Sequence, residues 1–229
     1  MIIGTGLIAK SLRPYDREDT VFIASGVSDS KCQDDKEFIR EKELVNKVID
    51  DYSDKKIVFF STYSINDPAM KNNMYVQKKI ELENYLSKLQ SIFYIIRISN
   101  LVGYGGNPSN VFNFLFNKIK SGELFILWPN AERNLVLVED FAFTMNNIIT
   151  DSLGRSVNTI SNIINPVNYN VKAIVSAIEI FLNKKANYHT VDVLSTVPVE
   201  EINYKNFFAR YEGDTSDYLY QILSVHYSK

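Results

Sequence analysis

The chain contains short runs that are apolar on both faces, which is typical of strands covered by helices on two sides. They are VFIASG (21–26), KIVFFST (56–62) and FYIIRISNLVG (93–103). The intervening segments have helical periodicity. The first carries Phe38, Ile39, Leu44, Val45, Val48 and Ile49, and the second is YVQKKIELENYLSKL (75–89). This alternation predicts an α/β fold with a mainly parallel sheet and helices on both faces.

Too few residues separate MII (1–3) from VFIAS (21–25) for more than one crossover helix, so these two strands are expected to be neighbours. The carboxyl half predicts a smaller, mixed region. Its expected elements are a helix near 110–120, the extended run LVLVED (135–140), a helix at 141–149, the strand SVNTIS (156–161), a helix at 171–182 and an irregular tail rich in Tyr and Phe.

Composition excludes several classes of function. With a formal net charge of −2 over 229 residues, the chain lacks the positive field that nucleic-acid binding generally needs. One cysteine, Cys32, and two distant histidines, His189 and His226, offer neither an internal disulfide nor a cysteine or histidine metal site. No apolar run approaches the roughly 20 residues of a membrane span. We expect a cytoplasmic protein without a metal, a nucleic-acid partner or a membrane partner.

The opening MIIGTGLIA places Gly4 and Gly6 between a short strand and a helix. Such a turn presents free backbone N–H groups and the positive end of a helix dipole, where a pyrophosphate can bind. A simple tight turn would have the same sequence, so this motif alone leaves both interpretations open.

A second motif is Tyr75-Val76-Gln77-Lys78-Lys79, in which Tyr75 and Lys79 share a helical face. A neighbouring ammonium lowers the pKa of a phenol and suits it to acid–base work. Ser61 and Thr62 end the strand just upstream, at the edge where open α/β sheets bind ligands. A lysine-rich surface helix is the competing interpretation of the YxxxK spacing.

Together these motifs resemble the extended short-chain dehydrogenase/reductases, the NAD-dependent epimerases and dehydratases of nucleotide sugars. The resemblance covers nearly the whole chain, and its motifs follow the family's order. They are GTGLIA (4–9), VFIASGVSDS (21–30), FFST (59–62), YVQKK (75–79), RISNLVG (97–103) and AERNLVLVEDFA (131–142). The resemblance implies a Rossmann-like core over 1–103 and a mixed α/β substrate-binding region over 104–229, of which about 134–161 returns to the core.

The resemblance also implies roles for individual residues. Tyr75 would be the acid/base, Lys79 would hold the nicotinamide ribose and tune Tyr75, and Thr62 would orient the reacting oxygen. Asn100 and Arg133 would contact the substrate, with Arg133 on its diphosphate. NAD or NADP would contact Gly4, Gly6, Leu7, Ile8, Ala24, Ser25, Gly26, Tyr75 and Lys79. All these residues are expected around one cleft at the carboxyl ends of the strands.

The chain departs from the family in two places. VFIASG follows the glycine turn directly, where the family inserts two further strands that carry the residue for the adenosine ribose. Asp16, Glu18 and Asp19 lie in that gap, but they precede VFIASG. The adenosine side is therefore expected to be truncated and the cofactor weakly bound. The interval from Thr62 to Tyr75 is only thirteen positions, which shortens the loop between them.

The resemblance implies an NAD(P)-dependent oxidoreductase or epimerase acting on a nucleotide-linked sugar, in particular a keto-sugar reductase in surface polysaccharide biosynthesis. The truncation favours an alternative, a non-catalytic protein that binds or senses a dinucleotide or nucleotide sugar. A scaffolding subunit is a third hypothesis. A homodimer through the helix that carries Tyr75 is a further expectation.

Overall fold

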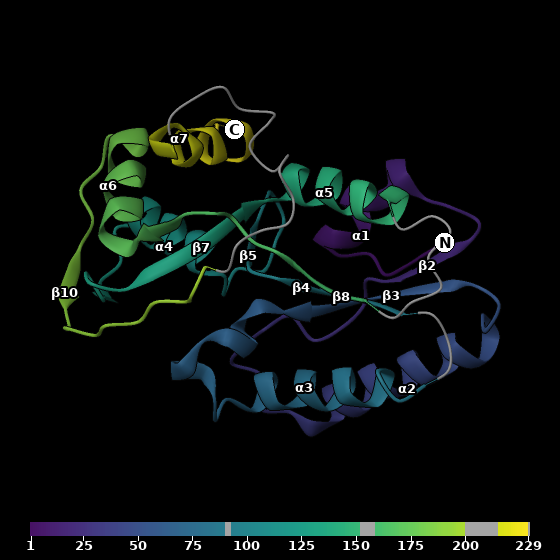
Figure 1. The fold of residues 1–229 in the computed structure, drawn as a ribbon. Helices are drawn as coiled ribbons and strands as arrows, with labels where there is room; N and C mark the ends of the chain where they lie inside the picture. The colour runs from purple at the N-terminus through teal and green to yellow at the C-terminus, as the bar shows by residue number, and fades with distance from the viewer. Residues whose placement is uncertain (90–92, 152–158, 200–214, 229) are drawn as a thin grey trace. The chain divides into compact units, whose positions relative to one another are not determined.

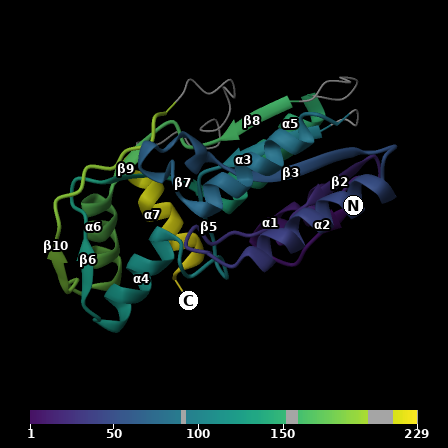
Figure 2. The same cartoon turned by 90° about the horizontal axis from the view of Figure 1, so that it is seen from below.

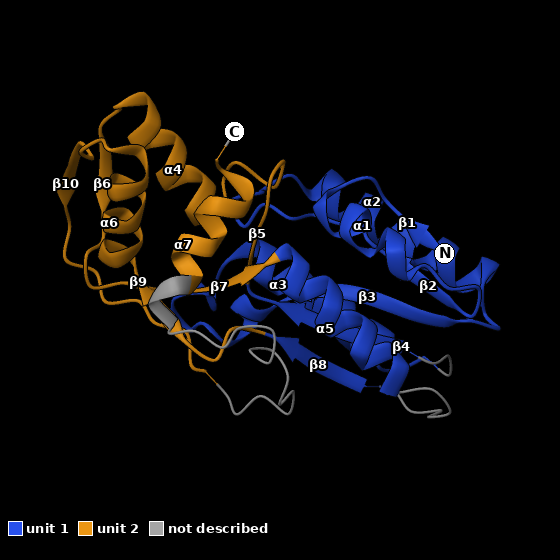
Figure 3. Cartoon of the chain, turned by 90° about the horizontal axis from the view of Figure 1, so that it is seen from above, with its two compact units in different colours: residues 1–99, 138–163 blue, residues 100–137, 164–229 orange. Residues whose placement is uncertain are grey.

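The computed structural model describes residues 1–89, 93–151, 159–199 and 215–228 (Figure 1). They form two compact units, coloured separately in Figure 3. The first unit comprises residues 1–99 and 138–163, and the second comprises residues 100–137 and 164–229. Within the described ranges, no helix combines the length and the apolar character needed to cross a bilayer.

The first unit is built on a five-stranded sheet in the order β1-β2-β3-β4-β8, and every pair is parallel. The strands are β1 (Ile2–Ile3), β2 (Thr20–Ile23), β3 (Lys56–Thr62), β4 (Phe93–Ile98) and β8 (Thr159–Ile163). The predicted mainly parallel sheet is confirmed. The four expected strands, MII, VFIAS, KIVFFST and FYIIRIS, all belong to it.

Helices cover both faces of this sheet, as predicted. They are α1 (Leu7–Leu12), α2 (Asp35–Asp51), α3 (Met74–Leu86) and α5 (Val138–Asp151). In Figure 1, α1 and α5 lie on one face, and α2 and α3 lie on the other. Figure 2, which views the cartoon from below, shows α2 and α3 from that second side. Because both faces are covered, β3 is buried along nearly its whole length.

β1 pairs in parallel with β2, with Ile2 opposite Phe22, and α1 is the crossover between them. The prediction that these strands are neighbours with one crossover helix is confirmed. In the described part of the chain β1 is also the edge strand of the sheet. No described strand therefore lies beyond β1. Three short 3₁₀ turns complete the first unit, at Arg13–Tyr15, Tyr63–Asn66 and Pro68–Met70.

Helix α2 forms because local capping and apolar spacing agree. Asp34 caps its start by accepting a hydrogen bond from the Lys36 backbone N–H. Its buried side chains recur at helical spacing, at Phe38, Glu41, Val45 and Val48. Ile39, which the sequence analysis includes in the apolar set, is 56% exposed, because it lies one position beyond the buried face.

The second unit is the expected smaller mixed α/β region. A three-stranded sheet has the order β5-β7-β9, in which β5 and β7 are parallel and β7 and β9 antiparallel, and a separate parallel pair joins β6 and β10. The strands are β5 (Asn100–Val102), β6 (Phe125–Leu127), β7 (Glu132–Leu137), β9 (Asn168–Asn170) and β10 (Tyr188–Thr190). The helices are α4 (Val111–Ser121), α6 (Val171–Leu182) and α7 (Thr215–His226).

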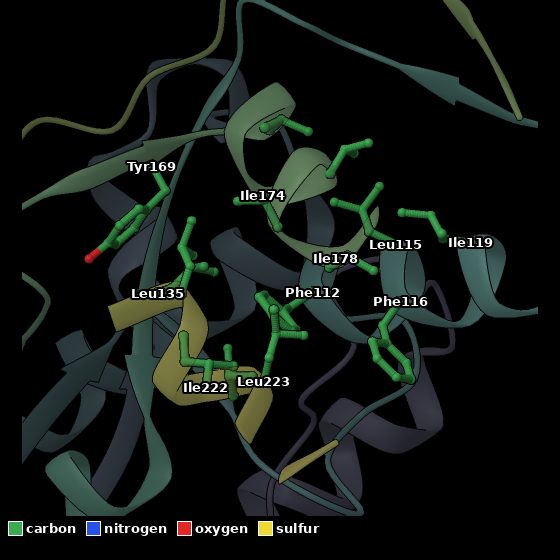
Figure 4. Packing of buried hydrophobic residues seen from close by; sticks show 14 of the residues in the cluster. Phe112, Leu115, Phe116, Ile119, Leu135, Tyr169, Ile174, Ile178, Ile222 and Leu223 are labelled. Atoms are coloured by element: carbon green, nitrogen blue, oxygen red, sulfur yellow. The ribbon is translucent and has the colours of Figure 1, made fainter. Parts of the chain in front are cut away.

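The core of the second unit lies among its three helices and the neighbouring strands (Figure 4). Helix α4 contributes Phe112 and Phe116, α6 contributes Ile174, and α7 contributes Ile222 and Leu223. The expected irregular tail is therefore wrong over Thr215–His226. The apolar residues of this stretch recur at helical spacing and are buried against the other two helices, so tertiary packing stabilises the helix.

Two other boundaries differ from the sequence analysis. The extended run ends at Leu137, and Val138 already begins α5, whose first turn carries Glu139 and Asp140. Acidic residues in a first turn interact favourably with the helix dipole, which favours the earlier start. The expected strand 156–161 is observed as β8 from Thr159, and residues 156–158 lie outside the described residues.

Candidate active site

The candidate site lies at the carboxyl ends of β1, β2 and β3 in the first unit. The sheet register places Ile3 opposite Ile23 and Ile23 opposite Phe59, so these strand ends lie at the same edge. Thr62 ends β3, and the segment Ala24–Gly26 follows β2. This is the edge at which open α/β sheets bind ligands.

The glycine turn has the geometry of a close backbone approach. Gly4 has a φ of +133°, which side chains rarely allow, and an added Cβ would overlap the carbonyl of Ala24. The Ala24 backbone N–H in turn donates to the carbonyl of Ile3 at 2.8 Å. Gly4 and Ala24, both predicted to contact the cofactor, therefore lie against each other.

Gly6, in contrast, has open space beside it. It directly precedes α1, and a Cβ added there would meet no atom within 4 Å. Leu7 and Ile8, the first residues of α1, are half-buried behind it. The space in front of the helix start is open, which is what the close approach of a phosphate group requires.

Tyr75 and Thr62 are brought together. The Thr62 side chain hydrogen-bonds the Tyr75 hydroxyl, and this contact lowers the pKa of the phenol. Thr62 Oγ1 also accepts from the backbone N–H of Ser64 at 3.2 Å, which fixes the start of the turn after β3. The Oγ of the neighbouring Ser61 is buried with no hydrogen-bond partner among the described residues.

Burial raises the pKa of Tyr75 above its usual value, and this effect outweighs the attraction of Lys79 and the hydrogen bond from Thr62. Tyr75 is 8% exposed and packs in an apolar cluster with Val27, Phe38 and Val76. The YxxxK spacing predicts that Lys79 lowers this pKa. Its charge does act in that direction, but desolvation is the larger effect.

Lys79 is buried, and its ammonium forms an ion pair with Glu41 of α2. The Nζ to Oε1 distance is 2.5 Å, and the two side chains are 3% and 1% exposed. The ammonium also lies over the rings of Phe59 and Tyr75, with 5.1 and 5.7 Å to their centroids. At Gly26, an added Cβ would overlap the Glu41 carboxylate, so a larger residue there would displace that side chain.

Glu41 was missed by the sequence analysis. In EFIREKELV it looks like one of many charged residues on a solvated helix face. Its spacing from Phe38 and Val45 nevertheless places it on the apolar side of α2, and that spacing is the signal that could have identified it.

Two polar side chains, Asn73 and Arg97, fix the helix that carries Tyr75 and Lys79. Asn73 caps the start of α3 by accepting from the Val76 N–H at 3.2 Å, and its own amide donates to the carbonyl of Ser30 at 3.0 Å. Near the other end, Arg97 of β4 donates to both carboxylate oxygens of Glu83, at 3.0 and 2.6 Å. A bidentate arginine–carboxylate pair restricts the orientation of both side chains strongly.

Asn100 and Arg133 belong to the second unit. The Asn100 amide donates to the carbonyl of Asn134 at 2.9 Å, linking β5 to β7. Arg133 donates to the carbonyl of Glu132 at 2.6 Å and to Ser195 Oγ at 3.1 Å. In the first unit, Gly4 lies against Ala24, and Thr62, Tyr75 and Lys79 lie together beside Gly26. The catalytic, cofactor-binding and substrate-binding roles of all the predicted site residues stay predictions.

The fold is similar to the folds of several solved structures. UDP-glucose 4-epimerase from Thermus thermophilus, in complex with NAD, is 15% identical with a TM-score of 0.62, and the match covers 90% of this chain and 77% of that one. UDP-N-acetylglucosamine 4-epimerase from Methanobrevibacter ruminantium is 14% identical with a TM-score of 0.67, covering 97% and 80%. RMD from Pseudomonas aeruginosa, complexed with NADPH, is 12% identical with a TM-score of 0.67, covering 97% and 86%.

The chain shares its fold with these proteins. The resemblance to the extended short-chain dehydrogenase/reductases is thereby confirmed at the level of the fold. No protein-family model matches the sequence, and no curated protein matches it either. All three structures are longer than this chain, since the match covers 77–86% of their length.

Proposed function

We propose that the protein is an NAD(P)-dependent enzyme acting on a nucleotide-linked sugar, and more narrowly a keto-sugar reductase. The observation that carries the proposal is the contact of Tyr75 with Thr62 and Lys79 in a fold shared with nucleotide-sugar epimerases. A tyrosine, a hydroxyl and an ammonium in contact form a unit for moving a proton. The setting in surface polysaccharide synthesis follows from the family resemblance.

The residues of the glycine turn fit the pyrophosphate of a dinucleotide. The space in front of Gly6 is open, and the close contact of Gly4 with Ala24 shapes the turn. Gly4, Gly6, Leu7 and Ile8 would hold the phosphates, and Ala24–Gly26 would flank the nicotinamide half. A bound NAD(P)H supplies the hydride in such a reaction.

The state of Tyr75 favours the reductive direction. A tyrosine with an ordinary pKa is already protonated at neutral pH, and burial raises the pKa of the Tyr75 hydroxyl further. When a carbonyl carbon gains hydride, its oxygen gains negative charge and needs a proton, which the Tyr75 hydroxyl can donate. Thr62, which contacts that hydroxyl, would orient the same oxygen by a hydrogen bond.

Binding of NADH and NADPH to the dialysed protein, followed by their fluorescence, tests the cofactor. We expect binding that is weak for this fold, because β1 is the edge strand of the described sheet and offers no neighbouring strand for the adenosine ribose. Oxidation of the bound cofactor on addition of a keto-sugar nucleotide would establish the reaction. If neither cofactor binds at millimolar concentration and no keto-sugar nucleotide turns over, the protein is a non-catalytic binding protein and the proposal is wrong.

Arg133→Ala tests the substrate site. If Arg133 contacts the substrate diphosphate, losing this charge-assisted hydrogen bond should cost about 1.5–3 kcal/mol of binding free energy, or roughly a 10-fold to 100-fold loss of affinity. The maximal rate should change less, because the contact is made in both the ground state and the transition state. Steady-state kinetics over a range of sugar nucleotide concentrations separates the two effects. Lys118→Ala, at another cation of the second unit, is the control.

A further inference from the structure

The Glu41–Lys79 pair has no role in the mechanism described so far. Glu41 is the buried carboxylate of a helix whose other acidic residues are exposed, and its only ion-pair partner among the described residues is Lys79. Only one of its oxygens is used: Oε1 binds the ammonium, and Oε2 is buried without a hydrogen-bond partner among those residues. A carboxylate placed for stability alone would be expected to use both oxygens, since an unsatisfied buried oxygen costs free energy.

Burial of such a pair is weak evidence for stabilisation, because desolvation of two charges offsets their attraction. What the pair does change is the electric field beside it. The Lys79 ammonium lies over the Tyr75 ring and donates to the carbonyl of Phe60 at 3.4 Å, so the charged pair lies beside Tyr75.

Four groups act on the Tyr75 hydroxyl in the described part of the chain. Lys79 of α3 and the Thr62 hydroxyl of β3 favour its ionised form. Glu41 of α2 and Asp29 of the loop after β2 disfavour it. Lys79 has the larger effect of the two paired charges, so Glu41 offsets part of the field that the lysine exerts.

We propose that Glu41 is a positioning residue for the proton donor: its carboxylate, paired with the Lys79 ammonium beside the Tyr75 ring, offsets part of that ammonium's charge, so that Tyr75 keeps its proton up to a higher pH. The catalytic meaning of this role rests on the proposed function, because a retained proton suits the reductive direction. The electrostatic role itself needs no cofactor and no substrate.

The test is a pH titration of the Tyr75 ring by NMR of protein labelled with ¹³C at tyrosine Cζ. The chain has 14 tyrosines, and the Tyr75 signal is identified by its absence from a Tyr75→Phe sample. In Glu41→Gln, which keeps the size of the side chain and removes its charge, the midpoint of the Tyr75 titration should move to lower pH. An unchanged midpoint, or one that moves to higher pH, would overturn the proposal.

Glu83→Gln is the matched control. Glu83 is also a buried glutamate in the first unit, but it pairs with Arg97 instead of Lys79. We expect this variant to be destabilised while its Tyr75 midpoint stays at the wild-type value. If Glu83→Gln shifts the midpoint as far as Glu41→Gln does, the shift reflects general loosening of the unit, which contradicts a specific role for Glu41.

A second pair of variants keeps the test decisive if Glu41→Gln does not fold. Apolar side chains of similar volume often replace a buried ion pair without loss of stability. Lys79→Met alone should move the Tyr75 midpoint to higher pH, and the double variant Glu41→Met/Lys79→Met should move it less, because the opposing charge is also gone. Equal shifts in the two proteins would mean that Glu41 offsets nothing.

The titration tests the role of Glu41 independently of the proposed enzyme activity. If the titration behaves as expected but no reductase activity is found, the role of Glu41 stands and the enzyme assignment fails. If reductase activity is found, the alkaline limb of its pH profile should also move to lower pH in Glu41→Gln, since a deprotonated Tyr75 cannot donate. If Glu41→Gln is active but neither the alkaline limb of its pH–activity profile nor its Tyr75 midpoint moves, the role of Glu41 is rejected. The enzyme assignment then remains intact.

Discussion

Tyr75→Phe should lower the turnover of a keto-sugar nucleotide by about 10²–10⁴-fold, which is the usual contribution of a general acid or base. The substitution removes only the hydroxyl that would donate the proton. The ring that packs with Val27, Phe38 and Val76 remains, so the fold should be retained. Binding of the cofactor and the sugar nucleotide should be nearly unchanged, because the hydroxyl acts mainly in the transition state.

Tyr85→Phe is the matched control for this experiment. Tyr85 lies on the same helix, is half-buried, and has Lys42 over its ring. Removal of the Tyr85 hydroxyl should leave the turnover of the keto-sugar nucleotide unaltered. Single-turnover measurements at saturating substrate compare the two variants directly. A Tyr75→Phe protein that retains the wild-type rate would remove Tyr75 from the mechanism.

Gly4→Ala should destabilise the first unit strongly. At a φ of +133° an alanine is strained, which alone costs about 1–3 kcal/mol. The added Cβ would also overlap the Ala24 carbonyl, which is backbone and cannot rotate away. Urea unfolding followed by far-ultraviolet circular dichroism measures the loss.

Gly6→Ala provides the comparison. Gly6 has a φ of −74°, and an added Cβ would meet nothing within 4 Å. Its unfolding free energy should therefore stay within about 0.5 kcal/mol of the wild type, while binding of NADH or NADPH weakens because the methyl group enters the space that a phosphate needs. Equal destabilisation by the two alanines would contradict the different surroundings of the two glycines.

Much of the first unit was readable from the sequence. KIVFFST and FYIIRIS became β3 and β4 because their runs of apolar residues can be buried only between two layers of helices. The place of β1 beside β2 followed from the short interval between them. Thr62 and Tyr75 met because a strand end and the next helix are close in sequence, and local geometry restricts where they can lie.

The second unit was harder to predict. Its short strands, such as β6 and β10, contain three residues each and pair with partners far along the chain. Helix α7 was missed because its tyrosines and polar residues give a weak local signal, and its stability comes from packing against α4 and α6.

The sequence by itself determined the α/β architecture, the glycine turn and the identity of Thr62, Tyr75 and Lys79 as one group, because each depends on periodicity or on spacing within one or two elements. Only the tertiary structure revealed the charge beside Lys79. Glu41 lies 38 residues away from it, and the two meet because α2 and α3 pack on the same face of the sheet, with Gly26 leaving room for the carboxylate. The state of Tyr75 depends on the same packing, since burial and distant charges, which no local spacing encodes, determine its pKa.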